Sequence, residues 1–291
     1  MGNVGAVQPA TAGSARMERP ARVLLGWLTA EEAALFQTGR GSRPMLAEYS
    51  ERFDRARAVV AERNGPPDQA ELISEAPVEL QDHTAALQEP AVAFFREGWR
   101  MAVADLTRVC ALQQSVFIDQ TLQRAAAVDP NDIRDIARIS LPLPNQDELP
   151  AQYDQSRSAW IISSSNPNLQ IAAPLHQQLP GGGRAIGFAV WVRSSYMQVA
   201  LFQGRYILRD GYHRAYGLLA RGINRVPVLF REFPQFQDLG LPAGLFGQHV
   251  YLGNRPPMLP DYLNDQVSET LAQPASQKMV IIAGLELNPL A

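Results

Sequence analysis

The sequence predicts an α+β protein, with a helical N-terminal region over residues 23–140 and a mixed α/β domain over residues 141–291. Before residue 140, apolar residues recur at three- and four-residue spacing, which is typical of amphipathic helices. After residue 141, short apolar runs alternate with Gly and Pro, which is typical of strands and turns. The 291 residues are enough for a large core, and the single cysteine excludes a disulfide framework.

The N-terminal elements follow from local signals. Residues 1–22 are rich in Gly, Ala and Ser and have no long apolar run, so we expect a disordered tail. Thr29 and Glu32 have the spacing of a capping box that opens a helix ending near Gln37. Apolar spacing predicts further helices over 45–64 and 133–139, the second capped by Asp129 or Asn131, and one long helix or two consecutive helices over 90–129.

The second half reads as strands with a few helical turns. Apolar runs predict strands at 159–163, 185–192, 197–202, 205–209 and 226–230, with a loop at the three glycines 181–183. The Pro- and Gly-rich stretch after Phe233 is predicted to be an extension of this domain. Within it we expect a short helical segment over 259–271 and a last strand over 278–285.

Residues 197–232 are the most informative about function. They predict a strand, a tight turn at Gln203-Gly204, a second strand, a glycine loop at Asp210-Gly211, a helix and a third strand. A helix that starts after Gly211 directs its free N–H groups at the junction, which favours an anion there. Arg214 suits phosphate or carboxylate, although it and His213 could instead pair with local carboxylates. Asp210 suits a hydroxyl or hydrated Mg²⁺, or it could be an ordinary helix N-cap.

The same segment resembles the core of the ParB N-terminal/sulfiredoxin superfamily, over about 36 residues. The matching stretches are Gly204-Arg205-Tyr206, Asp210 to Ala215, Gly222 and Val226-Pro227-Val228. Proteins of this superfamily hold nucleotide phosphates with this loop and helix N-terminus. The resemblance implies binding of a nucleotide, with Mg²⁺, or of another anionic small molecule. The implied site consists of Gly204, Arg205, Asp210, Gly211, Tyr212, His213 and Arg214.

The loop departs from the family pattern at Tyr212. Sulfiredoxins have a cysteine there, whose thiolate performs the chemistry, and partition proteins have a glutamate that helps hold the metal ion. Sulfiredoxin activity is therefore disfavoured, and Cys110 lies in an apolar stretch far along the chain. Nucleotide hydrolysis or phosphate transfer would also need a carboxylate outside the motif. Asp147 and Glu148 are candidates, but nothing singles out a catalytic residue.

Two other readings of function stay open. The domain could be a degenerate version of the fold that serves as a protein-interaction module of a larger assembly, with the helical region as partner surface and the loop filled by Tyr212 or His213. A DNA-associated role in partition or phage biology is the third. The net charge of -3 and the lack of a predicted helix pair after Phe233 argue against DNA binding.

The remaining expectations are absences. No apolar run approaches the length of a membrane span, so no membrane association is expected, and a cytoplasmic location follows by elimination. His83, His176 and His249 lack the spacing of metal ligands, so no metal site is expected from them.

Overall fold

The computed structural model describes residues 18–39, 44–66, 71–144, 149–164, 168–275 and 278–283, and it confirms the α+β class. Of the predicted N-terminal tail, residues 1–17 lie outside the described residues. Residues 18–22 are not a tail: they form most of strand β1 (Glu18–Val23), which pairs antiparallel with β12 (Glu269–Pro274). This long-range pairing, across about 250 residues of chain, leaves no local signal in the sequence.

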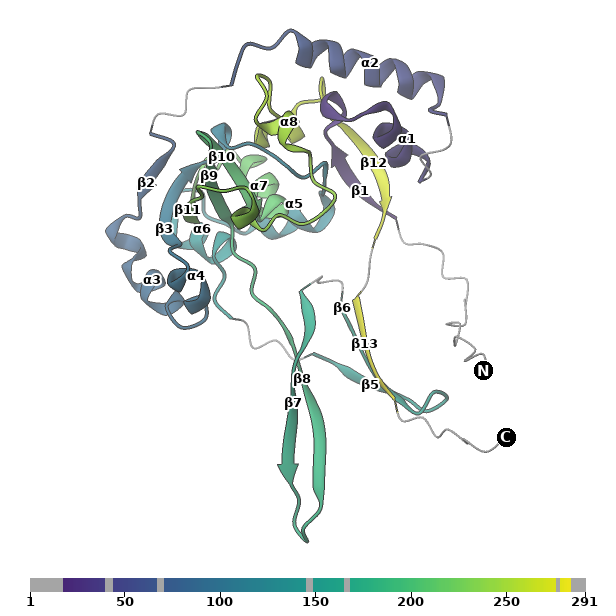
Figure 1. Cartoon of the computed structure of the whole chain (residues 1–291), viewed down its shortest axis with the longest axis vertical. Helices are drawn as coiled ribbons and strands as arrows, with labels where there is room; N and C mark the ends of the chain where they lie inside the picture. The colour runs from purple at the N-terminus through teal and green to yellow at the C-terminus, as the bar shows by residue number, and fades with distance from the viewer. Residues whose placement is uncertain are drawn as a thin grey trace.

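A five-stranded sheet forms the centre of the body (Figure 1). Its strand order is β10 (Arg205–Asp210), β9 (Gln198–Phe202), β11 (Arg225–Glu232), β3 (Arg100–Asp105) and β2 (Ile73–Glu75). Helix α7 (Tyr212–Leu219) connects β10 to β11, and β11 runs parallel to β9. The other neighbouring strands are antiparallel.

The elements predicted over residues 197–232 are confirmed. Gln203 and Gly204 both have positive φ, 47° and 72°, as a two-residue hairpin turn between β9 and β10 requires. Helix α7 begins directly after Gly211 and ends before Gly222, whose φ is 74°. The order of strand, turn, strand, helix and strand is therefore the one that the sequence predicts.

The helical prediction for residues 90–129 is wrong for most of that range. Only α4 (Val92–Arg96) and α5 (Asp119–Ala126) are helical, and β3 and β4 (Ser115–Phe117) lie between them. Strand β3 is buried between β11 and β2, and its residues from Met101 to Ala104 are all buried. A strand buried on both faces has a continuous apolar run, which periodicity cannot distinguish from a buried helix.

The other helices are close to prediction. Helix α1 (Ala30–Thr38) carries the predicted capping box of Thr29 and Glu32, and α2 spans Ala47–Ala61. Helix α6 (Ile133–Ser140) is capped by Asp132 rather than by Asp129 or Asn131, since the Asp132 side chain accepts the Arg134 N–H at 2.9 Å. Two short helices, α3 (Gln81–Leu87) and α8 (Gln248–Tyr251), complete the set of α-helices in the described part of the chain. Short 3-10 helices span Leu25–Trp27, Val78–Leu80, Leu106–Arg108, Gln237–Leu239 and Leu259–Leu263.

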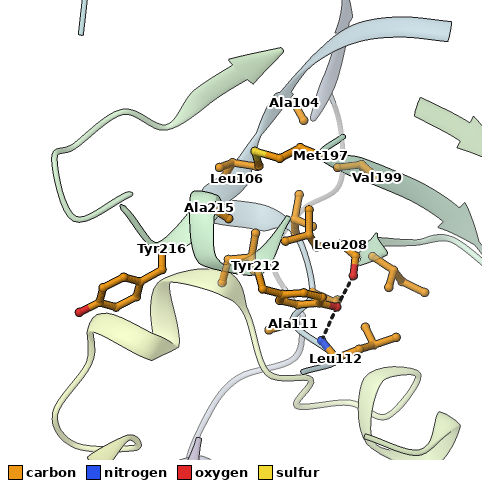
Figure 2. Close-up of a cluster of buried hydrophobic side chains, with 14 of the residues drawn as sticks. Ala104, Leu106, Ala111, Leu112, Met197, Val199, Leu208, Tyr212, Ala215 and Tyr216 are labelled. Atoms are coloured by element: carbon orange, nitrogen blue, oxygen red, sulfur yellow. Dashed lines mark hydrogen bonds between the residues drawn. The ribbon is translucent and has the colours of Figure 1, made fainter. Parts of the chain in front are cut away.

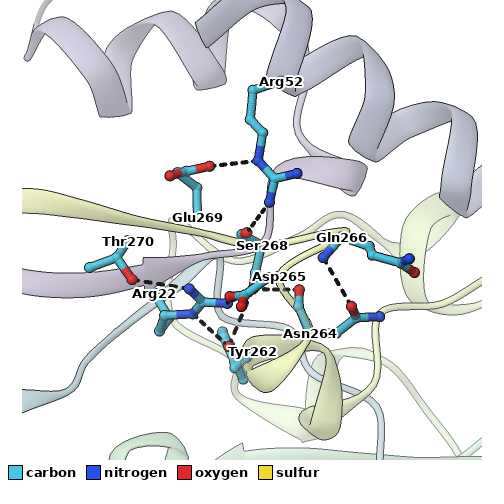
Figure 3. Close-up of polar contacts among 9 residues, drawn as sticks. All are labelled: Arg22, Arg52, Tyr262, Asn264, Asp265, Gln266, Ser268, Glu269 and Thr270. Carbon is cyan, nitrogen blue, oxygen red and sulfur yellow. Dashed lines mark hydrogen bonds and ion pairs between the residues drawn. The ribbon is translucent and has the colours of Figure 1, made fainter.

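Arginines from β1 and α2 bind the Pro- and Gly-rich C-terminal stretch through hydrogen bonds and ion pairs. Of the predicted helical segment over 259–271, only Leu259–Leu263 is helical, as a 3-10 turn, and β12 follows. The guanidinium of Arg22 is buried and donates to the Tyr262 carbonyl at 2.7 Å, to Asp265 at 2.8 Å and to the Thr270 hydroxyl at 3.0 Å (Figure 3). Arg52 pairs with Glu269 at 2.8 Å in the same cluster.

One hydrophobic core crosses the boundary predicted at residue 140. It includes Leu25, Phe53 and Leu106 from the first region and Leu208 and Tyr262 from the second. Strand β3 from the first region also lies inside the central sheet. Residues 23–140 therefore share one body with the strands that carry the loop motif.

Strands β5–β8 and β13 lie outside this body (Figure 1). Strands β5 (Ala151–Asp154), β6 (Ala159–Ser164) and β13 (Lys278–Ala283) form a three-stranded sheet, and the strands predicted over 159–163 and 278–285 correspond to β6 and β13. Strands β7 (Leu169–Gln178) and β8 (Arg184–Val192) form a two-stranded hairpin, which we call the arm. The three glycines 181–183 lie in its loop, as predicted.

Candidate functional site

The predicted loop lies at the junction of β10 and α7. At this junction the backbone of Gly211 lies so close to Met197 that there is no room for a side chain. Gly211 has φ 99°, and a Cβ at this position would lie 2.4 Å from Met197 Cγ and 3.0 Å from Met197 Cα. The missing side chain therefore makes room for the backbone just before β9. The glycine serves packing between two segments of the sheet, in addition to its positive φ.

Asp210 supplies a negative charge to the start of α7. Its Oδ1 accepts the Gly211 N–H at 2.6 Å, and its Oδ2 accepts the Ser195 hydroxyl at 3.0 Å. A carboxylate at a helix N-terminus is stabilised by the helix dipole. The anion that this junction favours is thus provided by the chain itself, and a phosphate placed there would meet a carboxylate.

Tyr212, the first residue of α7, is part of a cluster of buried hydrophobic side chains (Figure 2). Its side chain is buried in the hydrophobic core next to Ala111, and its hydroxyl accepts the Leu112 N–H at 3.1 Å and donates to the Leu208 carbonyl. Burial raises the pKa of Tyr212 far above its usual value, so the phenol stays neutral. Tyr212 is therefore part of the core.

His213 is neutral and packed. Its imidazole stacks on Phe117 with ring centroids 6.0 Å apart and an interplanar angle of 15°. Burial and the nearby Arg19 and Arg214 lower the pKa of His213 to about 4. The side chain consequently carries no positive charge for a phosphate at neutral pH.

The guanidinium of Arg214 donates hydrogen bonds to groups of the protein itself. One guanidinium nitrogen donates to the Ser195 carbonyl at 2.6 Å and lies 3.4 Å from the carbonyls of Ile139 and Ser140. The other donates to the Ser195 hydroxyl at 2.8 Å. Burial lowers the pKa of Arg214, and Asp210 partly opposes that effect. Ser195, which the sequence did not single out, thereby links the cation of Arg214 to the carboxylate of Asp210.

The other two predicted site residues lie away from the junction. Gly204 is in the turn at the opposite end of β10, and six residues of strand separate it from Gly211 by about 20 Å. Arg205 donates to the Gly253 carbonyl at 3.3 Å. The structure therefore brings together Asp210, Gly211, Tyr212, His213 and Arg214, but not Gly204 or Arg205. The carboxylates Asp147 and Glu148 lie outside the described residues.

A polar cleft of about 310 Å³ opens on the Asp210 side of the junction. Glu97, Arg193, Arg209 and Asp210 bring charges of both signs to it. Arg209 already donates to the Leu239 carbonyl at 2.5 Å and to the Gln198 side chain, and Glu97 lies 3.7 Å from Arg231. Because the two arginines that line the cleft are matched by two carboxylates, the cleft does not present a positive surface to a phosphate.

The arm is the most exposed apolar feature of the described residues. Among the large apolar side chains that it exposes, Ile186 is 69% exposed, Ile171 50% and Phe188 45%. Residues 169–192 contain one charged side chain, Arg184. The strand predicted over 185–192 corresponds to β8, but the sequence analysis did not predict that its apolar side chains are exposed. One signal could have indicated it: residues 169–192 contain no acidic residue and no lysine, whereas exposed edge strands usually carry such charges.

Within the described residues, no cluster of three or more His, Cys, Asp or Glu side chains is arranged to hold a metal ion. None of the described helices combines the length and apolar character needed to cross a membrane. No protein-family model, curated protein or solved structure matches the chain, so the resemblance to the ParB/sulfiredoxin superfamily stays a prediction.

Proposed function

We propose that this chain is a protein-interaction module that binds protein through the β7–β8 arm. One observation carries the proposal: the arm presents large apolar side chains to solvent on a two-stranded hairpin with a single charged residue. A free two-stranded hairpin is marginally stable in water, and contiguous exposed apolar surface marks interaction sites. The ParB/sulfiredoxin-like order of β9, β10, α7 and β11 would then be the scaffold that carries the arm.

The geometry of the loop supports this function over nucleotide binding. For Arg214 to bind a phosphate, its guanidinium would have to leave the carbonyl and hydroxyl of Ser195, which it contacts at 2.6 and 2.8 Å. Both acceptors are part-buried, and the loss of a hydrogen bond from a charged donor costs about 1.5–3 kcal/mol. The phosphate would also lie beside the Asp210 carboxylate, which repels it. The residues at the junction therefore do not fit a nucleotide phosphate, with or without Mg²⁺.

Site-specific photocross-linking tests the proposed function. A photoreactive phenylalanine analogue replaces Phe188 on the arm, and in a control chain it replaces Val78, which is 75% exposed on the body. In the cells that naturally produce the protein, we expect a discrete cross-linked protein band from position 188 and none from position 78. Absence of any cross-linked protein from position 188 contradicts the proposed function.

Calorimetric titration with ATP and with CTP, each with Mg²⁺, tests the rival function. We expect no binding heat from the folded protein. The Arg214→Gln variant is then expected to unfold at lower urea concentration, because the part-buried carbonyl and hydroxyl of Ser195 lose their charged donor. Saturable binding that Arg214→Gln abolishes without a loss of stability would establish the nucleotide site instead.

A further inference from the structure

Hydrogen bonds at the two ends of the arm show which backbone groups of β8 point outward. At the loop, Leu179 donates its N–H to the Gly183 carbonyl at 2.7 Å, and at the base Arg193 donates to the Asn168 carbonyl at 3.1 Å. In an antiparallel ladder, pairs that bond to each other alternate with pairs whose N–H and C=O groups point outward. Counted from either end, the alternation along β8 agrees. It turns the backbone groups of five residues away from β7: Arg184, Ile186, Phe188, Val190 and Val192.

The outer edge of β8 is free, whereas that of β7 is interrupted. Within the described part of the chain, the backbone of β8 bonds only to β7. On β7, Pro174 has no N–H to offer, a bulge between Ile171 and Ala173 shifts the ladder, and β13 lies close to the strand. A free edge with little charge is a template for another extended chain. The charge of β8 is confined to Arg184, at the end next to the loop.

Gly187 leaves a gap on one face of this edge. A Cβ added to Gly187 would meet no heavy atom within 4 Å, and its partner on β7 is Leu175, which is 55% exposed. Its neighbours on the same face of β8 are Ala185 and Ala189. An aromatic side chain on an adjacent strand stabilises an edge glycine by covering it. A strand added to β8 is therefore expected to carry an aromatic residue opposite Gly187.

We infer that the arm binds its partner by strand addition: an extended, uncharged segment of another protein pairs with the outer edge of β8 and places an aromatic side chain opposite Gly187. This inference rests on the proposed function and specifies the chemistry of the partner. The segment bonds to the five outward residues of β8, which gives affinity, and the side chain at Gly187 gives specificity. Its other side chains lie beside the exposed Ile186 and Phe188, where a charge would lose water without gaining a partner.

A second copy of β8 fits this edge less well than a free segment does. Two β8 strands related by a two-fold axis would place Trp191 opposite Gly187 only if the pairing were centred on Ala189. The loop of each arm would then reach past Ser194 of the other chain, to the level of Met197, which is fully buried in the body. Two-fold pairings centred closer to the loop keep the arms clear of the body. They place Gly187 opposite glycine or alanine, which leaves the gap open.

The cross-linking assay at position 188 tests the inference with a matched pair of proline variants. Ile186 and His176 are partners in the register, and their N–H groups point to the outer edges of β8 and β7 respectively. Proline at either position removes an outward donor and breaks no bond between the two strands. We expect Ile186→Pro to weaken the cross-link about tenfold, because a hydrogen bond is lost and the ring blocks the approach. His176→Pro is expected to leave it unchanged.

Two further variants separate the backbone from the side chains. Ile186→Ala shortens the same side chain but keeps the N–H, so we expect it to weaken the cross-link less than Ile186→Pro does. Gly187→Val fills the gap from the arm itself and has open space in the isolated chain, so we expect a weaker cross-link from a folded protein. Mass spectrometry of the cross-linked product then identifies the segment that pairs with β8.

The outcomes separate this inference from the proposed function. The inference is overturned by equal effects of Ile186→Pro and His176→Pro, by a Gly187→Val chain that cross-links as before, or by an Ile186→Ala chain as weak as Ile186→Pro. It is also overturned if the segment carries Asp, Glu, Lys or Arg opposite β8, or comes from a second copy of this chain. In each of these cases the arm still binds protein, so the proposed function stands. If position 188 of the otherwise unmodified chain cross-links to nothing, both are wrong.

Discussion

Replacement of Gly211 by alanine should destabilise the protein by about 2–5 kcal/mol. A positive φ costs a residue with a Cβ about 1–2 kcal/mol. The new Cβ would also lie 2.4 Å from Met197 Cγ, which can rotate away, and 3.0 Å from Met197 Cα, which cannot. Forcing extra volume into a packed core adds about 1–3 kcal/mol. Urea unfolding followed by tryptophan fluorescence measures the loss.

Gly222→Ala is the matched control at the other end of α7. Gly222 also has a positive φ, 74°, but its Cβ would meet no heavy atom within 4 Å. We expect it to cost only the backbone contribution, about 1–2 kcal/mol. The difference between the two variants isolates the contact with Met197. Equal losses from both would refute the argument that Gly211 is there to let the segment before β9 approach.

Three further predictions concern buried polar groups. Tyr212→Phe should cost about 1–3 kcal/mol in urea unfolding, because the Leu112 N–H and the Leu208 carbonyl lose their partner, and an unchanged midpoint would contradict the buried hydroxyl contact. His213 has a pKa of about 4 in the folded state, below the usual 6.5. Between pH 6.5 and pH 4 the unfolded chain is therefore protonated at this residue while the folded chain is not, so the free energy of unfolding should fall as the pH drops through this range. His213→Phe should flatten that part of the pH profile of the unfolding free energy, and an unaltered slope would argue against it. Burial raises the pKa of the Cys110 thiol to about 12, so a thiol reagent should label Cys110 only after denaturant is added, and prompt labelling of the native protein would be inconsistent with its burial.

Local sequence signals were enough to place the elements whose cause is local. The capping box at Thr29 and Glu32, the turn at Gln203-Gly204 and the glycine after α7 each depend on a few neighbouring residues, and all three are present. The signals failed for β3, because its apolar run is explained only by the strands on both sides of it. They also failed for residues 18–22, whose partner strand comes from the far end of the chain.

The candidate site divides in the same way. The sequence by itself determined that a strand, a glycine and a helix meet at Asp210-Gly211. Only the tertiary structure decided what the junction does with its polar groups, because the partners of Asp210, Tyr212 and Arg214 come from segments distant in sequence, such as Ser195 and Leu112. Likewise the sequence determined that β8 is an apolar strand, but burial depends on what packs against it. The apolar strand β3 is covered by the sheet, whereas the apolar hairpin of β7 and β8 lies outside the body with both faces open.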